Sequence, residues 1–344
     1  MAFIPIELHQ LIFDLLNFSS QVNYIDISFF TQQNLFIKEL NSEFLHQEKI
    51  DNSIINQKKF RNIIIIDLNL TKIKNIDHLA NLKVLYCSSS FNQHDINNLD
   101  LVKLSAYNNR YINSVNHMKK LKTLNAGGSC GINQAGIKNI DLVKLYAWGN
   151  EKIIDVNHMK NLKILNAESK CGIYQAGIEI VDLVELIAHN NTKINNVNHM
   201  KNLKILRIGY LSGINQAGIS DIDLIELDAH NNEKITSVNH MVNLKILRVG
   251  GQSGVDQAGI NGVNLITLDV SANRKITSVN HMVNLKFLNA NSNCGIDQDG
   301  ISNVNLVGID IDDNHKINDF NHMSNLKLLN GKKINRTKIY RVHI

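Results

Sequence analysis

Apolar residues along most of this chain recur with a long period, unlike the short period of a single helix or strand. From Leu142 the chain reads LVKLYAWGNEKIIDVNHMKN, and from Leu162 it reads LKILNAESKCGIYQAGIEIVD. The apolar positions of the first stretch are Leu142, Leu145, Ala147, Ile153, Val156 and Met159. The L-x-x-L-x-A start of each stretch predicts a short strand whose alternate side chains enter the core.

The two stretches together form a unit that repeats along the chain. The tripeptide Asn-His-Met marks each unit, and its histidine recurs every 41 residues, at His117, His158, His199, His240, His281 and His322. A degenerate copy, Asp77-His78-Leu79, lies 39 residues before the first. Such a period is typical of solenoids, because one coil cannot bury its own apolar side and is stabilised by stacking on its neighbours.

Each half-unit is 20 or 21 residues long and fits L-x-x-L-x-(L/A)-x-x-(N/C)-x-(I/L). From about residue 60 to 330 the chain therefore resembles the leucine-rich-repeat family. The resemblance implies an α/β solenoid of about 14 coils in doubled 41-residue units, with parallel strands on the concave face. We expect four parts: a helical segment at 1–45, a connector or cap at 46–60, the solenoid at 61–330 and a C-terminal cap at 331–344.

Two polar columns follow the predicted strands. An asparagine stands where the chain leaves every second strand, at Asn109, Asn150, Asn191, Asn232, Asn273 and Asn314. In this family such an asparagine is expected to bond backbone groups of adjacent coils. The alternate coils carry Cys130, Cys171, Ser212, Ser253 and Cys294. Because these lie two coils apart, about 10 Å, they are too distant for disulfides, and we interpret them as structural.

The histidine column and a glycine-rich element raise the question of a catalytic or metal site. Successive histidines are also about 10 Å apart, whereas zinc ligands lie within about 2.1 Å of one ion, so we predict either a helical-turn cap or a hydrogen-bonded convex position. The Gly131–Ile137 stretch and its copies lack the Gly-Lys-Ser/Thr of a phosphate loop. We expect their glycines to supply positive φ at a tight convex turn. Without a catalytic motif, we expect no enzyme activity, cofactor or metal.

Other columns differ from copy to copy at positions predicted to face outward from the strands. One coil type has aromatic residues early, histidines in the middle and aspartates late, and the other has two arginines. Tyr, Trp and Arg are frequent interaction hot spots. We predict target-binding residues at Tyr107, Tyr146, Trp148, His189, Arg207, His230 and Arg248. The alternative is an ordinary exposed strand surface.

The first 45 residues have a different pattern. Apolar residues at 4, 8, 12 and 16 predict an amphipathic helix with Pro5 in its first turn, and Val22–Phe30 and Phe36–Leu40 suggest further short helices. The start resembles the F-box opening Leu-Pro-x-Glu-Leu-x-x-x-Ile-x-x-x-Leu. The matching residues are Ile4, Pro5, Glu7, Leu8, Ile12 and Leu16. The usual Val-Cys and Trp that follow are absent, which leaves open a helical cap on the first coil.

The F-box resemblance implies the substrate receptor of a cullin–RING ubiquitin ligase. Its helices would dock a Skp-type adaptor, and the solenoid would hold a protein target. The alternative is a stand-alone interaction scaffold with a helical cap. The layout and the Asn/Ile/Lys-rich composition are similar to repeat proteins of amoeba-infecting giant viruses, which implies a host–virus role in the cytoplasm, including that of a host cell. Apart from its partners, we expect a monomer.

Composition narrows the classes of function and of cellular compartment that remain. A net charge of +5 from 36 basic and 31 acidic residues is too weak an asymmetry for a nucleic-acid binder of this size. Four cysteines without C-x-x-C spacing indicate a reducing, intracellular compartment. The N-terminus is a poor signal peptide, and no stretch reaches the roughly 18 apolar residues of a membrane span. The basic, partly apolar end from Gly331 to Arg341 suggests a strand over the last coil, or else a patch for an anionic partner.

Overall fold

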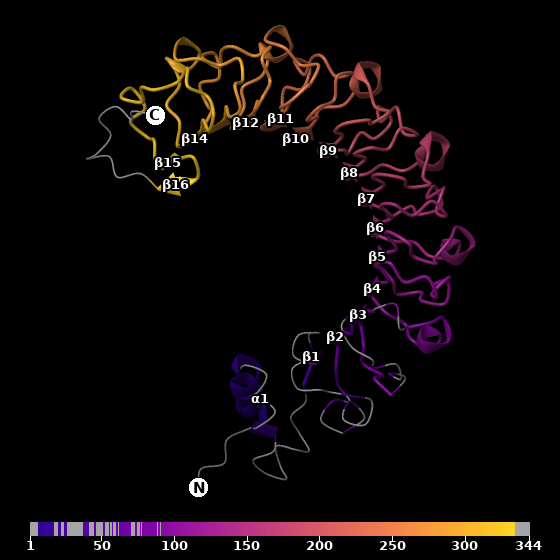
Figure 1. Ribbon diagram of the computed structural model, residues 1–344. Coiled ribbons are helices and arrows are strands. Elements are labelled where there is room, and N and C mark those ends of the chain that lie inside the picture. The colour runs from indigo at the N-terminus through magenta and orange to yellow at the C-terminus, as the bar shows by residue number, and fades with distance from the viewer. Residues whose placement is uncertain are drawn as a thin grey trace. The chain divides into compact units, whose positions relative to one another are not determined.

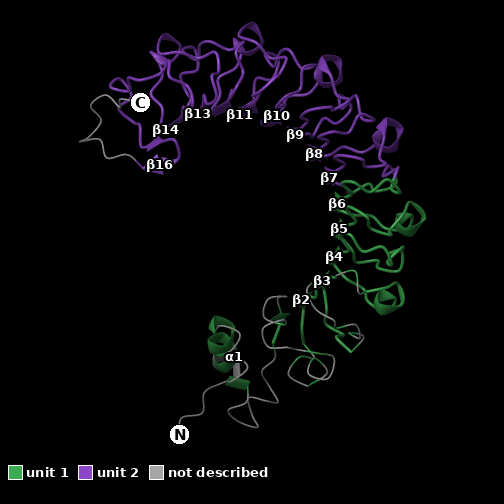
Figure 2. Cartoon of the chain, viewed as in Figure 1, with its two compact units in different colours: residues 1–153, 158–161 green, residues 154–157, 162–344 purple. Residues whose placement is uncertain are grey.

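The computed structural model describes residues 6–16, 20–21, 24–25, 37–40, 45, 51, 55, 57, 60, 62–69, 73, 76, 78–87, 89 and 91–333. The chain divides into two compact units (Figure 2). Unit 1 comprises residues 1–153 and 158–161, and unit 2 comprises residues 154–157 and 162–344. Each is described by itself.

Unit 1 consists of short parallel strands joined by coils. Its strands are β1 (Glu39–Leu40), β2 (Ile65–Asp67), β3 (Val84–Tyr86), β4 (Lys103–Ser105), β5 (Thr123–Asn125) and β6 (Lys144–Tyr146), and they pair in sequence order. Its helices are α1 (Ile6–Leu15) and the 3₁₀ helices η2 (His94–Ile96) and η3 (Ala135–Ile137).

Unit 2 continues the same design. Its strands are β7 (Ile164–Asn166), β8 (Glu185–Ile187), β9 (Ile205–Arg207), β10 (Glu226–Asp228), β11 (Ile246–Arg248), β12 (Thr267–Asp269), β13 (Phe287–Asn289), β14 (Gly308–Asp310), β15 (Leu328–Leu329) and β16 (Lys332–Lys333). Only the β15–β16 pair among these described strands is antiparallel. The 3₁₀ helices are η4 (Gln175–Ile178), η5 (Gln216–Ile219), η6 (Ala258–Ile260) and η7 (Asp299–Ile301).

Within each unit the strands line one side, called here the strand side, and the 3₁₀ helices lie on the other, the outer side (Figure 1). The middle residue of a strand is buried, as at Leu104 and Leu227, whereas its neighbours are half-exposed. The residue after the strand, such as Ala106, is buried again. This alternation, repeated in register, stacks apolar side chains into one continuous core within each unit.

The sheet of unit 1 begins earlier than the sequence suggests. The helix predicted over Phe36–Leu40 is wrong at its described end, because Glu39–Leu40 forms β1 and pairs with Ile65–Ile66 of β2. The backbone N–H groups of Ile64 and Ile65 both donate to the Lys38 carbonyl. Ile37 and Leu40 are buried, so this segment gains more from covering the first coil than from local helical hydrogen bonds.

The asparagine column behaves as predicted. Asn191 is buried; its Nδ2 donates to the carbonyls of Ala167 (2.7 Å) and Ile173 (3.2 Å), and its Oδ1 accepts from the Lys193 N–H (2.9 Å). The same pattern recurs at Asn150, Asn273 and Asn314. One amide thus satisfies backbone groups that the end of the strand would leave buried and unpaired.

The histidine column lies on the outer side, hydrogen-bonded as predicted. In every copy the ring Nε2 lies 2.9–3.2 Å from the carbonyl of an isoleucine about 21 residues earlier, as in His199 to Ile178. A carbonyl only accepts, so Nε2 is the protonated nitrogen. Each histidine therefore ties its coil to the one before it.

The glycines of the repeated Gly-Ile-Asn-Gln-Ala-Gly-Ile element do not have the positive φ that we expected. Neither Gly131 nor Gly136 belongs to the positive-φ residues of the described chain. A Cβ on Gly136 would instead lie 2.0 Å from the Asn113 carbonyl oxygen, and one on Gly218 would lie 2.1 Å from that of Asn195. Glycine is required here because the backbones of successive coils approach closely.

At the C-terminal end of unit 2, β16 pairs with β15 through Leu328–Lys333 and Leu329–Lys332. Gly331 takes φ +70° in the turn between the two strands. Residues 334–344 lie outside the described part of the chain, so the proposed anionic-partner patch there stays a hypothesis. Within the described residues, no helix is long and apolar enough to cross a membrane.

Candidate functional site

Three outward positions in each coil carry the side chains of the strand side. Two are the first and third residues of the strand, and the third is the second residue after the strand, as in Lys144, Tyr146 and Trp148. The target-binding residues predicted from the sequence occupy only the last two positions. The prediction that Tyr107, Trp148, His189 and His230 lie on the strands is wrong, because each lies in the turn that follows.

In unit 1, Tyr107 and Trp148 form a stacked aromatic pair. Their ring centroids are 5.1 Å apart with an interplanar angle of 29°. Tyr107 is 40% exposed and Trp148 is half-buried. The rings meet across the intervening coil because that coil carries Gly127, where a Cβ would lie 2.8 Å from Trp148 Nε1. Tyr146 lies at the end of β6, in register with Asn125.

In unit 2, His189 and His230 likewise pack against glycines of the adjacent coils. A Cβ on Gly209 would lie 2.8 Å from His189 Nδ1, and one on Gly250 would lie 2.4 Å from His230 Cε1. Both histidines are half-buried against these glycines. The sequence contains this signal, since large residues alternate with glycine in the column Tyr107, Gly127, Trp148 and again in His189, Gly209, His230, Gly250.

Arg207 and Arg248 belong to a row of alternating charges across β8 to β11. Arg207 donates to Glu185 through Nη1 and to Glu226 through Nη2 at 3.2 Å. Arg248 Nη1 donates to the same Glu226 Oε1 at 2.7 Å. The side chain of Glu226 is 13% exposed and that of Arg207 is 28% exposed. Shared contacts of this kind orient both guanidinium groups and balance their charge.

Sequence reasoning missed Glu185 and Glu226. Both occupy the first strand position, and both arginines occupy the third, so each ion pair runs diagonally between adjacent strands. The parallel register therefore decides which glutamate reaches which arginine. The glutamates and arginines of alternate coils can be seen in the sequence. Which glutamate pairs with which arginine follows only from the register of the strands.

In unit 2 the third strand position is acidic in every second strand from β10 onward, at Asp228, Asp269 and Asp310. The Asp269 carboxylate accepts from the Ser271 hydroxyl (2.7 Å) and from the Asn289 amide (3.1 Å). Asp310 Oδ1 accepts from the Gly331 N–H at 2.9 Å. The strand side thus changes from aromatic in unit 1 to paired charge and then to acid within unit 2.

The cysteine column is buried and free of disulfides, as expected from its spacing. Burial raises the pKa of Cys130 to about 11 and that of Cys171 to about 11. It also raises the pKa of Cys87 and of Cys294. A neutral, buried thiol is a poor nucleophile. In the described residues, no group of three or more His, Cys, Asp or Glu side chains could hold a metal ion.

The N-terminal helix α1 is anchored by Phe13, which is 1% exposed, and by an ion pair between Asp14 and Lys38 at 3.1 Å. Three apolar side chains point to solvent: Leu11 (62% exposed), Ile12 (40%) and Leu15 (82%). Of the adaptor-binding residues predicted from the sequence, Ile12 is exposed and Leu16 is half-buried. Ile4 and Pro5, and the side chains of Glu7 and Leu8, lie outside the described residues.

No protein-family model matches this sequence, and no curated protein matches it significantly. Many solved structures are similar in fold, among them the following three. An internalin, inlF, of Listeria monocytogenes is 15% identical, with 94% of this chain and 93% of that chain covered and a TM-score of 0.48. The TLR13 chain of a complex with ssRNA13 is 15% identical, with 85% and 49% covered and a TM-score of 0.53.

The third is a leucine-rich-repeat protein of Leptospira interrogans, 14% identical, with 87% of this chain and 78% of that chain covered and a TM-score of 0.39. At these identities the similarity concerns the fold alone. The repeat signature, the asparagine column and the parallel strands of both units agree with it. This chain has the fold of an α/β leucine-rich-repeat solenoid.

Proposed function

We propose that this chain is a protein-binding scaffold that holds a protein target on its strand side. The observation that carries the proposal is a contrast between columns. The middle strand residue is leucine or isoleucine from β2 to β14 and is buried, whereas the outward positions change from coil to coil. Because the constant columns already build the core, the outward variation is free to serve recognition.

The chemistry of the outward residues supports a protein target. Tyr107 and Trp148 offer a rigid stacked pair, and Arg207 and Arg248 are held in place by Glu226. Aromatic and arginine side chains that are ordered before binding lose little conformational entropy at an interface. In this proposal the scaffold positions its target and performs no chemistry on it.

The test is affinity capture followed by mass spectrometry, with the full chain as bait. We expect the double substitution Tyr107→Ala and Trp148→Ala to reduce recovery of the captured target at least tenfold, an effect of about 1.4 kcal/mol or more. The matched control is Tyr174→Ala, which removes a 39% exposed aromatic ring at the start of η4, on the outer side. Equal recovery by all three baits would contradict the proposal.

We further propose that α1 docks a Skp-type adaptor and so makes this chain the substrate receptor of a cytoplasmic cullin–RING ubiquitin ligase. The support is the exposed apolar face of α1 at Leu11, Ile12 and Leu15 together with the F-box-like opening of the sequence. An amphipathic helix with such a face fits an apolar groove on a partner. The competing function is a scaffold without an adaptor, in which α1 only caps the first coil.

Substituting Leu15→Asp distinguishes the two functions. Leu15 is 82% exposed, so the change should leave folding intact and abolish recovery of adaptor and cullin if α1 docks them. Val283→Asp, at a 78% exposed apolar residue of unit 2, is the matched control. If the intact chain recovers neither adaptor nor cullin but still captures its target, the receptor proposal fails and the scaffold proposal stands.

A further inference from the structure

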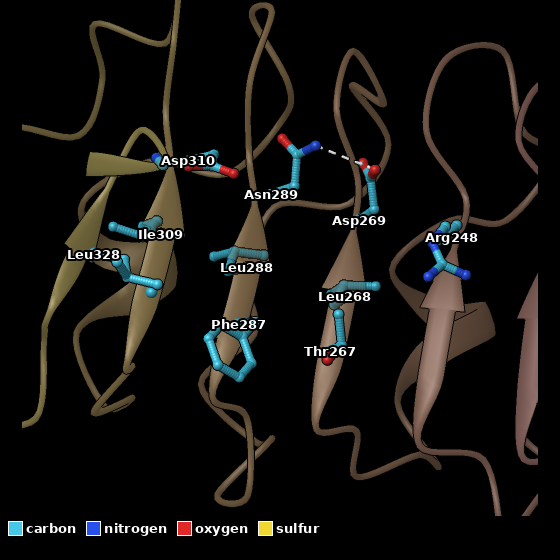
Figure 3. A pocket seen from close by; sticks show the side chains of 12 residues that line it. Arg248, Thr267, Leu268, Asp269, Phe287, Leu288, Asn289, Ile309, Asp310 and Leu328 are labelled. Carbon is cyan, nitrogen blue, oxygen red and sulfur yellow. Dashed lines mark hydrogen bonds between the residues drawn. The ribbon is translucent and has the colours of Figure 1, made fainter. Parts of the chain in front are cut away.

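The end of the strand side of unit 2 contains a hollow of about 200 Å³. Residues of β12, β13 and β14 and Leu328 of β15 line it (Figure 3). Gly331 also lines it. The hollow is apolar near the start of these strands, at Phe287 and Leu328, and polar where the strands end, at Asp269, Asn289 and Asp310.

Gly308 lines the apolar end of this hollow. The first strand position of the same coil type carries a side chain at Lys103, Lys144, Glu185, Glu226 and Thr267, but β14 has glycine there. Even a Cβ on Gly308 would lie only 3.0 Å from the Phe287 ring. With no side chain at this position, the Phe287 ring and Leu328 lie over Gly308, which is buried, while the Phe287 ring remains 39% exposed.

The polar end carries two carboxylates. Asp269 and Asp310 are bonded only to neutral donors, namely Ser271, Asn289 and Gly331, and neither makes an ion pair within the described residues. Arg248 also lines the hollow, but its guanidinium is bound to Glu226 on the far side of its strand. Asp312, which is exposed two residues beyond Asp310, adds to the negative charge.

The spacing of these groups fits one long cationic side chain. The carboxylate row lies two residues along the strands from Phe287 and Gly308, roughly 6.6 Å at 3.3 Å per residue. Asp269 and Asp310 are two strands apart, roughly 9.6 Å. An arginine has an aliphatic stem for the apolar end and a planar fork of donors that can reach carboxylates on both sides, whereas a lysine ammonium is a single point charge.

We propose that this hollow receives an arginine side chain of the protein target. The inference rests on the proposed scaffold function and deepens it, because it names the chemistry that one end of the strand side recognises. The arginine stem packs on the exposed part of the Phe287 ring, and its guanidinium donates to Asp269 and Asp310. A target of this chain then carries an exposed arginine at the corresponding end of its interface.

The test uses N-acetylarginine methylamide as the probe and amide-resolved NMR of the full isotope-labelled chain as the readout. We expect saturable shifts at Gly308, Asn289 and Gly331, and no such shifts with the citrulline analogue, which has nearly the same shape without the charge. The double substitution Asp269→Asn and Asp310→Asn should weaken binding at least tenfold. Asp221→Asn, which removes an exposed carboxylate just after η5, should leave binding unchanged.

A second variant keeps both carboxylates and displaces the Phe287 ring, because a Cβ at residue 308 would lie 3.0 Å from that ring. Gly308→Thr copies the residue found at Thr267, and it should also weaken arginine binding at least tenfold while the chain stays folded by circular dichroism. Equal binding of the arginine and citrulline probes, or equal loss in Asp221→Asn, would overturn the inference. Equal binding of the lysine analogue would overturn the choice of arginine.

The outcome is separable from that of the scaffold proposal. If the arginine probe does not bind but the Tyr107 and Trp148 substitutions still reduce target capture at least tenfold, only the arginine pocket is refuted. If the probe binds but no target is captured by the intact chain, the pocket is real and the scaffold proposal fails.

Discussion

The outer side and the strand side of the coils use the same repeat in opposite ways. On the outer side, histidine, glutamine and glycine recur in fixed columns, and their side chains or backbones meet the adjacent coil, as with His199 and Gly218. On the strand side, the outward residues differ from copy to copy, and the structure joins them in small local groups such as Tyr107 with Trp148.

The glutamine column shows what the outer side contributes. Gln216 Oε1 accepts from the backbone N–H groups of Thr236 and Ser237 at 2.9 Å, and its Nε2 donates to the Ser237 carbonyl at 3.0 Å. Gln93, Gln257 and Gln298 repeat these bonds. The outer side and the asparagine column fix the spacing of the coils, which leaves the strand side free to change. Substitutions should therefore cost most stability in the fixed columns and least on the strand side.

Asn191→Ala should have the largest effect. It leaves the carbonyls of Ala167 and Ile173 and the N–H of Lys193 without their partner. We expect a loss of about 3 kcal/mol in the free energy of unfolding, because buried backbone groups then stay unpaired. Urea denaturation measures it. Thr192→Ala, at the exposed neighbouring residue, is the control and should change stability by less than about 0.5 kcal/mol. Comparable losses in both variants would contradict the role of the column.

Gly218→Ala should follow, with a loss of about 2 kcal/mol. The new Cβ would lie 2.1 Å from the Asn195 carbonyl oxygen, so the two coils must move apart. Thermal or urea unfolding gives the value, with Ala217→Ser at the exposed neighbour as the control. If Gly218→Ala were neutral, the close approach of the coils would not explain this glycine.

The Cys171 thiol should make stability depend on alkaline pH. Burial raises its pKa from 9.0 to about 11, so the folded state holds the proton more tightly than the unfolded state does. The resulting stabilisation is complete below pH 9 and is lost as pH rises towards 11. Relative to Cys171→Ser, the intact chain should lose roughly 1–2 kcal/mol between pH 8 and pH 10.5.

The measurement for Cys171 is parallel urea unfolding of both proteins at the two pH values. Serine is a suitable replacement because the same column holds Ser212 and Ser253, both buried. Since the two proteins differ only at residue 171, the difference isolates the thiol. Identical pH dependence in the two proteins would show that Cys171 is not buried as described.

Glu226→Gln, on the strand side, should have the smallest effect on folding. It removes the carboxylate that Arg207 and Arg248 share, but both arginines are partly exposed, so we expect a loss of no more than about 1 kcal/mol. Glu233→Gln, at an exposed residue outside this row of alternating charges, is the control. A loss as large as that of Asn191→Ala would remove the distinction between the fixed columns and the strand side.

Local spacing in the sequence was sufficient for the features that each coil repeats. Parallel coils, with their polar and apolar positions in the right places, were predicted from the 41-residue period, the leucine of each strand and the asparagine column. These predictions succeed because every coil must bury the same apolar side against the same kind of neighbour. Equivalent residues of different repeats therefore lie in similar environments. The hydrogen-bonded histidines followed from the same periodicity.

What only the tertiary structure decided depends on contacts between coils. The register of adjacent strands selects Glu226 as the shared partner of two arginines, and the close approach of two backbones, rather than a positive φ, demands Gly136. The strand at Glu39–Leu40 exists because β2 offers it a partner. Such features arise from contacts between residues about 20 positions or more apart in the sequence. The residue pattern within one coil gives no information about the distances between coils.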